Sequence, residues 1–159
     1  MALRRIIIEN DFVLNPEAVL HTTCKDVLNF DENLQLLVDD LIETLHNCGN
    51  AVGLAAPQVG ILKKVAVVDV GKGPVVLINP EIVEESGSEA GVEGCLSYPN
   101  RWLEVKRPTS VKVKTFDLTG KQLFLQSSGF LARVFCHEID HLSGIVFLDR
   151  DEGGLALKT

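Results

Sequence analysis

The sequence predicts an α+β protein in which mixed, largely antiparallel sheets pack around a C-terminal helix, with a second helix in the N-terminal third. Apolar residues recur every three to four positions in two segments, residues 32–47 and 128–143. Between these segments lie short β-branched runs bounded by turn residues. Two of the runs read as a hairpin, which argues against a repeated βαβ unit.

Composition narrows the class of protein without naming a function. The chain has 159 residues, a hydrophobic content of 46% and a formal net charge of −7. This length favours one domain over residues 1–159 with an ordinary hydrophobic core. The acidic balance predicts no stable nucleic-acid partner, and no apolar run is long enough to suggest a membrane segment. Acidic residues near the start argue against a targeting peptide, so we expect a cytoplasmic protein with reduced cysteines.

The first helix is expected over residues 32–47. Asp31 is placed to accept hydrogen bonds from the first turn, and Gly49 lies where a left-handed residue would end the helix. The apolar stripe consists of Leu34, Leu37, Val38, Leu41, Ile42 and Leu45. The helix is therefore interpreted as core scaffolding.

Strands are expected next, over residues 64–70 and 75–78, where valine predominates. Residues 110–116 alternate strictly, which places two lysines on the face opposite the apolar one. The face expected to be buried carries Val111, Val113 and Thr115. Residues 117–120 then read as the turn of a hairpin that returns over 121–126.

The last helix is expected over residues 128–143, with Gly144 ending it. Its apolar face is expected to comprise Phe130, Leu131, Val134, Phe135, Ile139 and Leu142. This helix contains the motif HExxH, from His137 to His141. Two histidines four residues apart share a helix face and can bind one metal ion, while the adjacent Glu138 can reach a water molecule there. The alternative is a chance pair of one partly buried and one solvated histidine.

A third metal ligand must come from upstream of the motif. The position where metzincins carry a third histidine is Phe147 in this chain. Cys95 is favoured, because Gly94 precedes it in a bend between expected strands and permits close backbone approach. His21, His46 and a carboxylate remain as alternatives. Cys24, Cys48 and Cys136 are interpreted as structural.

Three motifs in this order resemble those of the peptide deformylase family. They are GLAAPQVG at residues 53–60, EGCLS at 93–97 and HEIDH at 137–141. The similarity continues through residues 105–108 and 129–132 and covers most of the chain after about residue 30. The resemblance implies a metal-dependent hydrolase that removes the N-formyl group from the formyl-methionine of nascent polypeptides.

By matching positions, the resemblance also assigns roles to individual residues. The implied metal ligands are Cys95, His137 and His141. The implied general acid/base is Glu138, and the oxyanion is served by Gln58 and Leu96. The substrate backbone is expected to contact Val52, Gly53 and Gly94. The methionine pocket is expected to be formed by Phe130, the stem of Arg133, Val134 and the ring of His137.

Two positions depart from the family pattern. Ala51 stands where the first motif usually opens with another glycine, and Cys136 stands where a polar residue is common. Neither change removes a catalytic group. Gln58 also has a simpler interpretation, as a solvated amide in a loop whose residue Ala56 is pushed toward extended geometry by the proline that follows it.

The cofactor is expected to be one divalent metal ion. Cysteine and histidine ligands suit several metals, and the family implies Fe²⁺ in cells, with Zn²⁺, Ni²⁺ or Co²⁺ possible in a purified sample. The chain is expected to act as a monomer and to come only transiently near the ribosome. A basic patch suited to that contact would comprise Lys106, Arg107, Lys112 and Lys114.

Two other functions remain open at the level of sequence. One is a small metallopeptidase or amidase that uses the same HExxH chemistry on a different acyl group. The other is a non-catalytic metal-binding or peptide-binding relative, for which loss of Glu138 or a fourth protein ligand would be the sign.

Overall fold

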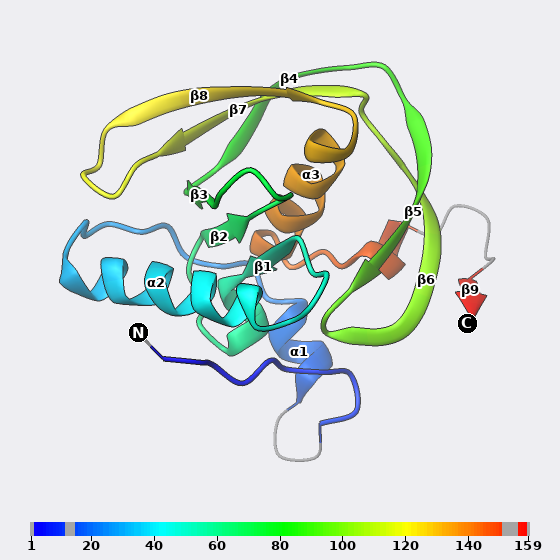
Figure 1. Ribbon diagram of the computed structural model, residues 1–159, viewed down its shortest axis with the longest axis horizontal. Coiled ribbons are helices and arrows are strands. Elements are labelled where there is room, and N and C mark those ends of the chain that lie inside the picture. Colours follow the sequence, from blue (N-terminus) through cyan, green and yellow to red (C-terminus); the bar gives the residue numbers. More distant parts are fainter. Residues whose placement is uncertain (1, 12–14, 151–155, 159) are drawn as a thin grey trace.

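The computed structural model describes residues 2–11, 15–150 and 156–158. Its helices are α1 (Pro16–Leu20), α2 (Glu32–His46) and α3 (Phe130–Leu142), with 3₁₀ turns η1 (Ala56–Val59) and η2 (Phe147–Arg150). Its strands are β1 (Gly53–Ala55), β2 (Val65–Val68), β3 (Val75–Ile78), β4 (Glu81–Ser86), β5 (Glu89–Cys95), β6 (Tyr98–Arg107), β7 (Ser110–Phe116), β8 (Gln122–Ser128) and β9 (Ala156–Lys158). Figure 1 shows α3 near the centre with strands on several sides of it.

The predicted fold class is confirmed. The strands form three antiparallel sheets, ordered β1-β2-β3, β4-β7-β8 and β5-β6-β9. Four of the six strand pairs join successive strands through hairpins or short loops, whereas β4–β7 and β6–β9 pair strands that are distant in the sequence.

The β1-β2-β3 sheet separates the two long helices. Val65 and Val67 of β2 belong to the hydrophobic cluster that contains the apolar side of α2. Ala66 and Val68, which alternate with them, belong to the cluster that contains α3. All four side chains have 0% exposure, because this short strand is covered on both faces. A strand buried on both sides reads as an unbroken apolar run, which is the pattern of residues 65–68.

The β4-β7-β8 sheet covers α3 from another side. Val111 and Val113 of β7 pack in the same cluster as Ala132 and Phe135 of α3, as the strict alternation predicts. The expected hairpin turn at residues 117–120 is present, and Gly120 has the positive φ of +87° that its last position requires.

Both long helices begin and end close to the predicted positions. The side chain of Asp31 accepts a hydrogen bond from the backbone N–H of Leu34, and Gly144 follows α3 with φ of +73°. The predicted apolar face of α3 is wrong at Phe130, which is 58% exposed. Conversely, α3 buries four polar side chains that were not predicted to be part of its buried face, Arg133, His137, Glu138 and His141.

Several elements have bounds that the sequence pattern did not predict. Helix α1 spans only five residues, too few for a periodic signal. Strands β4, β5 and β6 contain charged residues and glycines that weaken the strand pattern. Ala56 begins the 3₁₀ turn η1 and is not extended, so the preference imposed by Pro57 is overridden by the tertiary structure.

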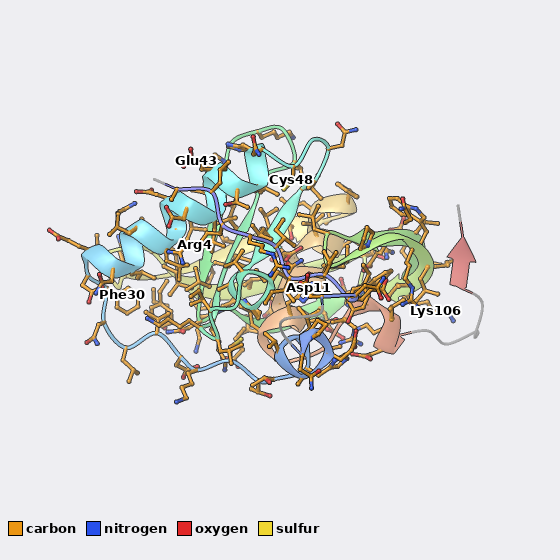
Figure 2. All side chains as sticks on the ribbon, turned by 90° about the horizontal axis from the view of Figure 1, so that it is seen from below. Arg4, Asp11, Phe30, Glu43, Cys48 and Lys106 are labelled. Atoms are coloured by element: carbon orange, nitrogen blue, oxygen red, sulfur yellow. The ribbon has the colours of Figure 1, made fainter. Side chains whose placement is uncertain are left out.

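The N-terminal segment, residues 2–11, ties separate parts of the fold together. It passes alongside α2, where the Ala2 N–H and the Arg4 side chain both donate to Asp40 (Figure 2). Further along, the Ile7 N–H donates to the Gln58 carbonyl at 2.7 Å and the Glu9 N–H donates to the Ser97 carbonyl at 2.9 Å. These bonds connect η1 with the turn between β5 and β6.

Within the described ranges, no helix has both the length and the apolar character required to cross a bilayer.

The Asp31 cap gives a direct test of how α2 is held. We expect Asp31→Ala to lower the free energy of unfolding by about 1 kcal/mol, because the N–H of Leu34 loses its acceptor. Urea denaturation followed by circular dichroism measures this change. Asp31→Ser is the matched control, since serine retains a capping oxygen. Equal loss in both variants would contradict a capping role.

Candidate metal centre and active-site cleft

Three side chains that suit a transition metal converge at one end of the cleft. The ligand atoms of Cys95, His137 and His141 all lie within 4.8 Å of one another, and no other such group occurs in the described parts of the chain. The two histidines come from successive turns of α3, with ring centroids 5.1 Å apart. Cys95 comes from the end of β5, and its Sγ lies 3.4 Å from the Nε2 of His141.

The surroundings of His137 fit a metal ligand. Its Nδ1–H donates to the Oε1 of Glu93 at 2.9 Å, so Nε2 is left unprotonated for a metal ion when the ring is neutral. A thiolate and two imidazoles are donors that Zn²⁺ and Fe²⁺ accept, and three protein ligands are typical of catalytic metal sites. The residues present therefore fit a divalent metal ion.

The competing candidates for the third ligand are engaged elsewhere. The Nε2 of His21 lies 3.1 Å from a carboxylate oxygen of Asp149, and the Nε2 of His46 lies 2.8 Å from Asp69. Cys24 and Cys136 are buried in the hydrophobic core, and burial raises the pKa of each thiol to about 11. The unusual Cys136 thus packs in the core, while Cys48 lies at the cleft wall.

Glu138 is a buried carboxyl group beside the three donors. Its side chain is 4% exposed, and its Oε1 has no hydrogen-bond partner among the described residues. Burial raises its pKa to about 7, so the group can hold or release a proton near neutral pH. Gly53 leaves the space that this side chain occupies, because a Cβ at that position would lie 2.5 Å from the Oε2 of Glu138.

Gln58 is not the solvated amide of the simpler interpretation, since it is only 1% exposed. Its Oε1 accepts from the Ala55 N–H at 2.9 Å, which fixes the orientation of the amide. Its Nε2 donates to the Ser97 hydroxyl at 3.1 Å and lies 3.5 Å from the Cys95 sulfur. The amide N–H groups are thereby directed toward the metal centre.

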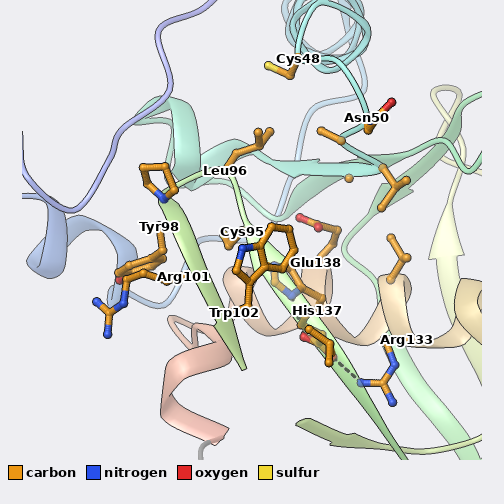
Figure 3. A pocket seen from close by; sticks show the side chains of 18 of the residues that line it. Cys48, Asn50, Cys95, Leu96, Tyr98, Arg101, Trp102, Arg133, His137 and Glu138 are labelled. Carbon is orange, nitrogen blue, oxygen red and sulfur yellow. Dashed lines mark hydrogen bonds and ion pairs between the residues drawn. The ribbon is translucent and has the colours of Figure 1, made fainter. Parts of the chain in front are cut away.

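A cleft of about 470 Å³ opens beside these residues (Figure 3). The predicted substrate-contacting residues Val52, Gly53 and Gly94 all line it. Leu96, which is expected to serve the oxyanion, and the variant position Ala51 line it as well. Trp102 covers Gly94, because a Cβ there would lie 2.5 Å from the indole ring. The residues expected to select methionine, Phe130, Arg133, Val134 and His137, line the same cleft.

Behind the cleft lies a buried cluster of charges centred on Glu93. The Nε and Nη2 of Arg107 donate to the two carboxylate oxygens of Glu93, at 2.8 and 2.9 Å. Its third nitrogen, Nη1, donates to Asp140. Burial alone would raise the pKa of Glu93, but hydrogen bonds from Arg107 and His137 lower it to about 2. Glu93 is consequently a carboxylate at neutral pH.

The predicted basic patch is wrong at Arg107, which belongs to this buried cluster. Arg107 is 3% exposed, so it is not available to a surface partner. The alternation of β6 contains the signal that was missed, because Leu103, Val105 and Arg107 share its buried face. The importance of Glu93, of the Arg133 guanidinium and of Trp102 was also missed, since each depends on contacts between distant elements.

Comparison with known proteins places these features in a family. Residues 10–153 match the model of a family described as polypeptide deformylase. Peptide deformylase 1 of Clostridium acetobutylicum is 50% identical over 84% of this chain and 89% of its own length, and peptide deformylase 1 of Bacillus subtilis is 47% identical over 87% of each. The crystal structure of peptide deformylase from Thermotoga maritima matches with a TM-score of 0.87 and 42% identity over 94% of this chain and 98% of that one. The crystal structure of a peptide deformylase from Synechococcus elongatus in complex with actinonin matches with a TM-score of 0.86 and 38% identity over 95% of this chain and 80% of that one.

The buried charge cluster is expected to dominate local stability. Arg107→Ala should lower the free energy of unfolding by about 3–5 kcal/mol, because Glu93 loses its main buried counter-charge. Urea denaturation at neutral pH measures the loss. Lys63→Ala removes an exposed cation as a control and should change stability by less than about 0.5 kcal/mol. An Arg107→Ala loss no larger than that of the control would argue against this account.

Proposed function

Because the chain belongs to the polypeptide deformylase family, we propose that it removes the N-formyl group from the N-terminal formyl-methionine of nascent polypeptides. The observation that carries the proposal is the convergence of Cys95, His137 and His141 beside the buried carboxyl of Glu138. These three side chains would hold one divalent metal ion, and residues 1–159 would act as a single catalytic domain.

Glu138 is assigned the proton transfers of the reaction. A divalent ion held by Cys95, His137 and His141 would supply Lewis acidity to the reaction. Glu138 takes a proton from the attacking water and later gives it to the departing amine. Its raised pKa, caused by burial, suits both steps, because the group exchanges a proton near neutral pH.

Gln58 and Leu96 are assigned to the negative charge that develops on the formyl oxygen. The Gln58 amide is held by Ala55 and Ser97 and its Nε2 faces Cys95, so an N–H group of this amide is directed toward the place proposed for the formyl oxygen before the substrate binds. The backbone N–H of Leu96 is the second proposed donor, in the turn directly after Cys95. Donors that are fixed before the reaction lower its barrier because they need no reorientation.

The substrate backbone is proposed to lie between the segments that carry Val52, Gly53 and Gly94. An extended peptide can add to such segments through main-chain hydrogen bonds. The methionine side chain would enter the part of the cleft lined by Phe130, Val134 and the aliphatic stem of Arg133.

Family membership supports Fe²⁺ as the proposed metal in cells, and the ligand set also suits Zn²⁺, Ni²⁺ or Co²⁺, which could replace it in a purified sample. We further propose that the protein works in the cytoplasm as a monomer. Its partners would be formyl-methionine nascent chains close to the ribosome, met only transiently, with no stable nucleic-acid or membrane partner.

The role of Glu138 can be separated from metal binding. We expect Glu138→Gln to keep a full equivalent of metal but to lower kcat on formyl-Met-Ala-Ser by at least about 10²-fold, because the amide cannot accept the proton. Metal content by mass spectrometry and release of formate measure the two properties. Glu84→Gln, at an exposed position on β4, is the control. Full activity of metal-loaded Glu138→Gln would refute the assignment.

The acyl group distinguishes deformylation from a broader amidase activity. We expect formyl-Met-Ala-Ser to be hydrolysed at least about 10²-fold faster than acetyl-Met-Ala-Ser, since the acetyl methyl must fit beside the metal ligands in a closed site. Parallel measurements of kcat/KM on the two peptides provide the ratio. Comparable rates would favour the amidase alternative.

A further inference from the structure

Strand β5 and helix α3 meet through three successive pairs of residues. Gly91 lies against Arg133, Glu93 bonds His137, and Cys95 contacts His141. The β5 residues are two apart and the α3 residues are four apart. Two strand residues rise about 6.7 Å and four helix residues rise about 6 Å, so the spacings match closely enough for all three pairs to form.

The second and third pairs contain the proposed metal ligands, whereas the Arg133 guanidinium of the first pair has no role in the reaction described above. This guanidinium is nevertheless held by several fixed acceptors. Arg133 donates to the carbonyl of Glu89 at 2.7 Å and to that of Val105 at 2.9 Å. It also donates to the Oε2 of Glu93 at 2.8 Å. One side chain of α3 is therefore bonded to both β5 and β6.

Gly91 makes this arrangement possible. A Cβ at position 91 would lie 2.9 Å from the Cζ of Arg133 and 3.0 Å from its Nε. Such contacts are shorter than van der Waals separation, so any larger residue would displace the guanidinium. Figure 3 shows the Arg133 guanidinium extending from α3 away from the Glu138 carboxyl.

Glu93 connects this first pair to the metal centre. Its Oε2 accepts from Arg107 and Arg133, and its Oε1 accepts from Arg107 and His137. With both oxygens held from two sides, the carboxylate has one orientation in which to receive the His137 N–H. Loss of Arg133 would leave Arg107 as the one guanidinium that holds the Glu93 carboxylate for His137.

We propose that Arg133 is a positioning residue that keeps β5 in register with α3, so that Cys95 and the two histidines converge on one metal ion. The inference rests on the proposed function, because it takes these three residues as the metal ligands. It concerns the guanidinium and not the aliphatic stem, which lines the methionine part of the cleft.

The test separates these two parts of the side chain. Arg133→Met keeps an apolar stem of similar length and removes every polar contact. We expect it to weaken Co²⁺ binding about 10–100-fold, the usual loss when a partner behind a metal ligand is removed. KM for formyl-Met-Ala-Ser on Co²⁺-saturated enzyme is measured alongside, because a change in KM without a change in Co²⁺ affinity reports on the methionine pocket and not on the metal ligands. Co²⁺ affinity is measured from the cobalt–thiolate absorption in competition with a chelator.

A second variant protects the test against a failure to fold. Gly91→Ala leaves Arg133 in the sequence but places a methyl group where its guanidinium lies, and it should weaken Co²⁺ binding in the same direction. In the double variant, the loss in free energy of Co²⁺ binding should be smaller than the sum of the losses in the two single variants, because both substitutions act on one contact. Arg133→Lys should recover part of the affinity, since an ammonium group can still reach Glu93.

Arg4→Met is the matched control. Arg4 lies on the N-terminal segment, away from the cleft, and its replacement removes an ion pair with Asp40 of α2. This change should leave Co²⁺ affinity unchanged. A raised KM with wild-type Co²⁺ affinity in Arg133→Met and Gly91→Ala would overturn the inference and leave Arg133 as a pocket wall only. Failure of the wild-type protein to bind Co²⁺ through its thiolate would instead count against the proposed function.

Discussion

The burial of one carboxylate, Glu93, is the constraint on which the arrangement of the cleft depends. A charged group with a 4% exposed side chain loses most of its hydration, so it must be compensated by charges and donors from the protein. Arg107 from β6 and Arg133 and His137 from α3 provide them. The same carboxylate therefore joins the β5–β6 ribbon to α3 and orients His137, one of the three candidate metal ligands.

Three glycines allow side chains to lie directly against the strands around this carboxylate. Gly53 makes room for Glu138, Gly91 for Arg133 and Gly94 for the ring of Trp102. Each contact would be shorter than van der Waals separation if a Cβ were present. Their positions are set by close approach rather than by backbone conformation, since none of the three has a positive φ. The cleft is thus shaped as much by missing side chains as by those that line it.

The wall of the cleft that contains Gln58 is held by hydrogen bonds from the N-terminal segment, which is distant in the sequence. The N-terminal segment bonds the backbones of Gln58 and Ser97, and the side chains of these two residues bond each other. Hydrogen bonds to both its main chain and its side chain therefore hold Gln58 in place. This arrangement keeps an amide beside the metal centre although η1 is only one short turn.

The sequence by itself determined the features that depend on near neighbours. The 3.6-residue period and the Asp31 cap predicted α2, the alternation of residues 110–116 predicted β7, and the four-residue spacing in HExxH placed two histidines on one face of α3. The three motifs also carried the family resemblance. Only the tertiary structure decided that Cys95 meets these histidines, that Arg107 is buried and that Phe130 is exposed. Burial and ligand contacts arise between elements separated by tens of residues, and a local pattern contains no information on which distant element covers it.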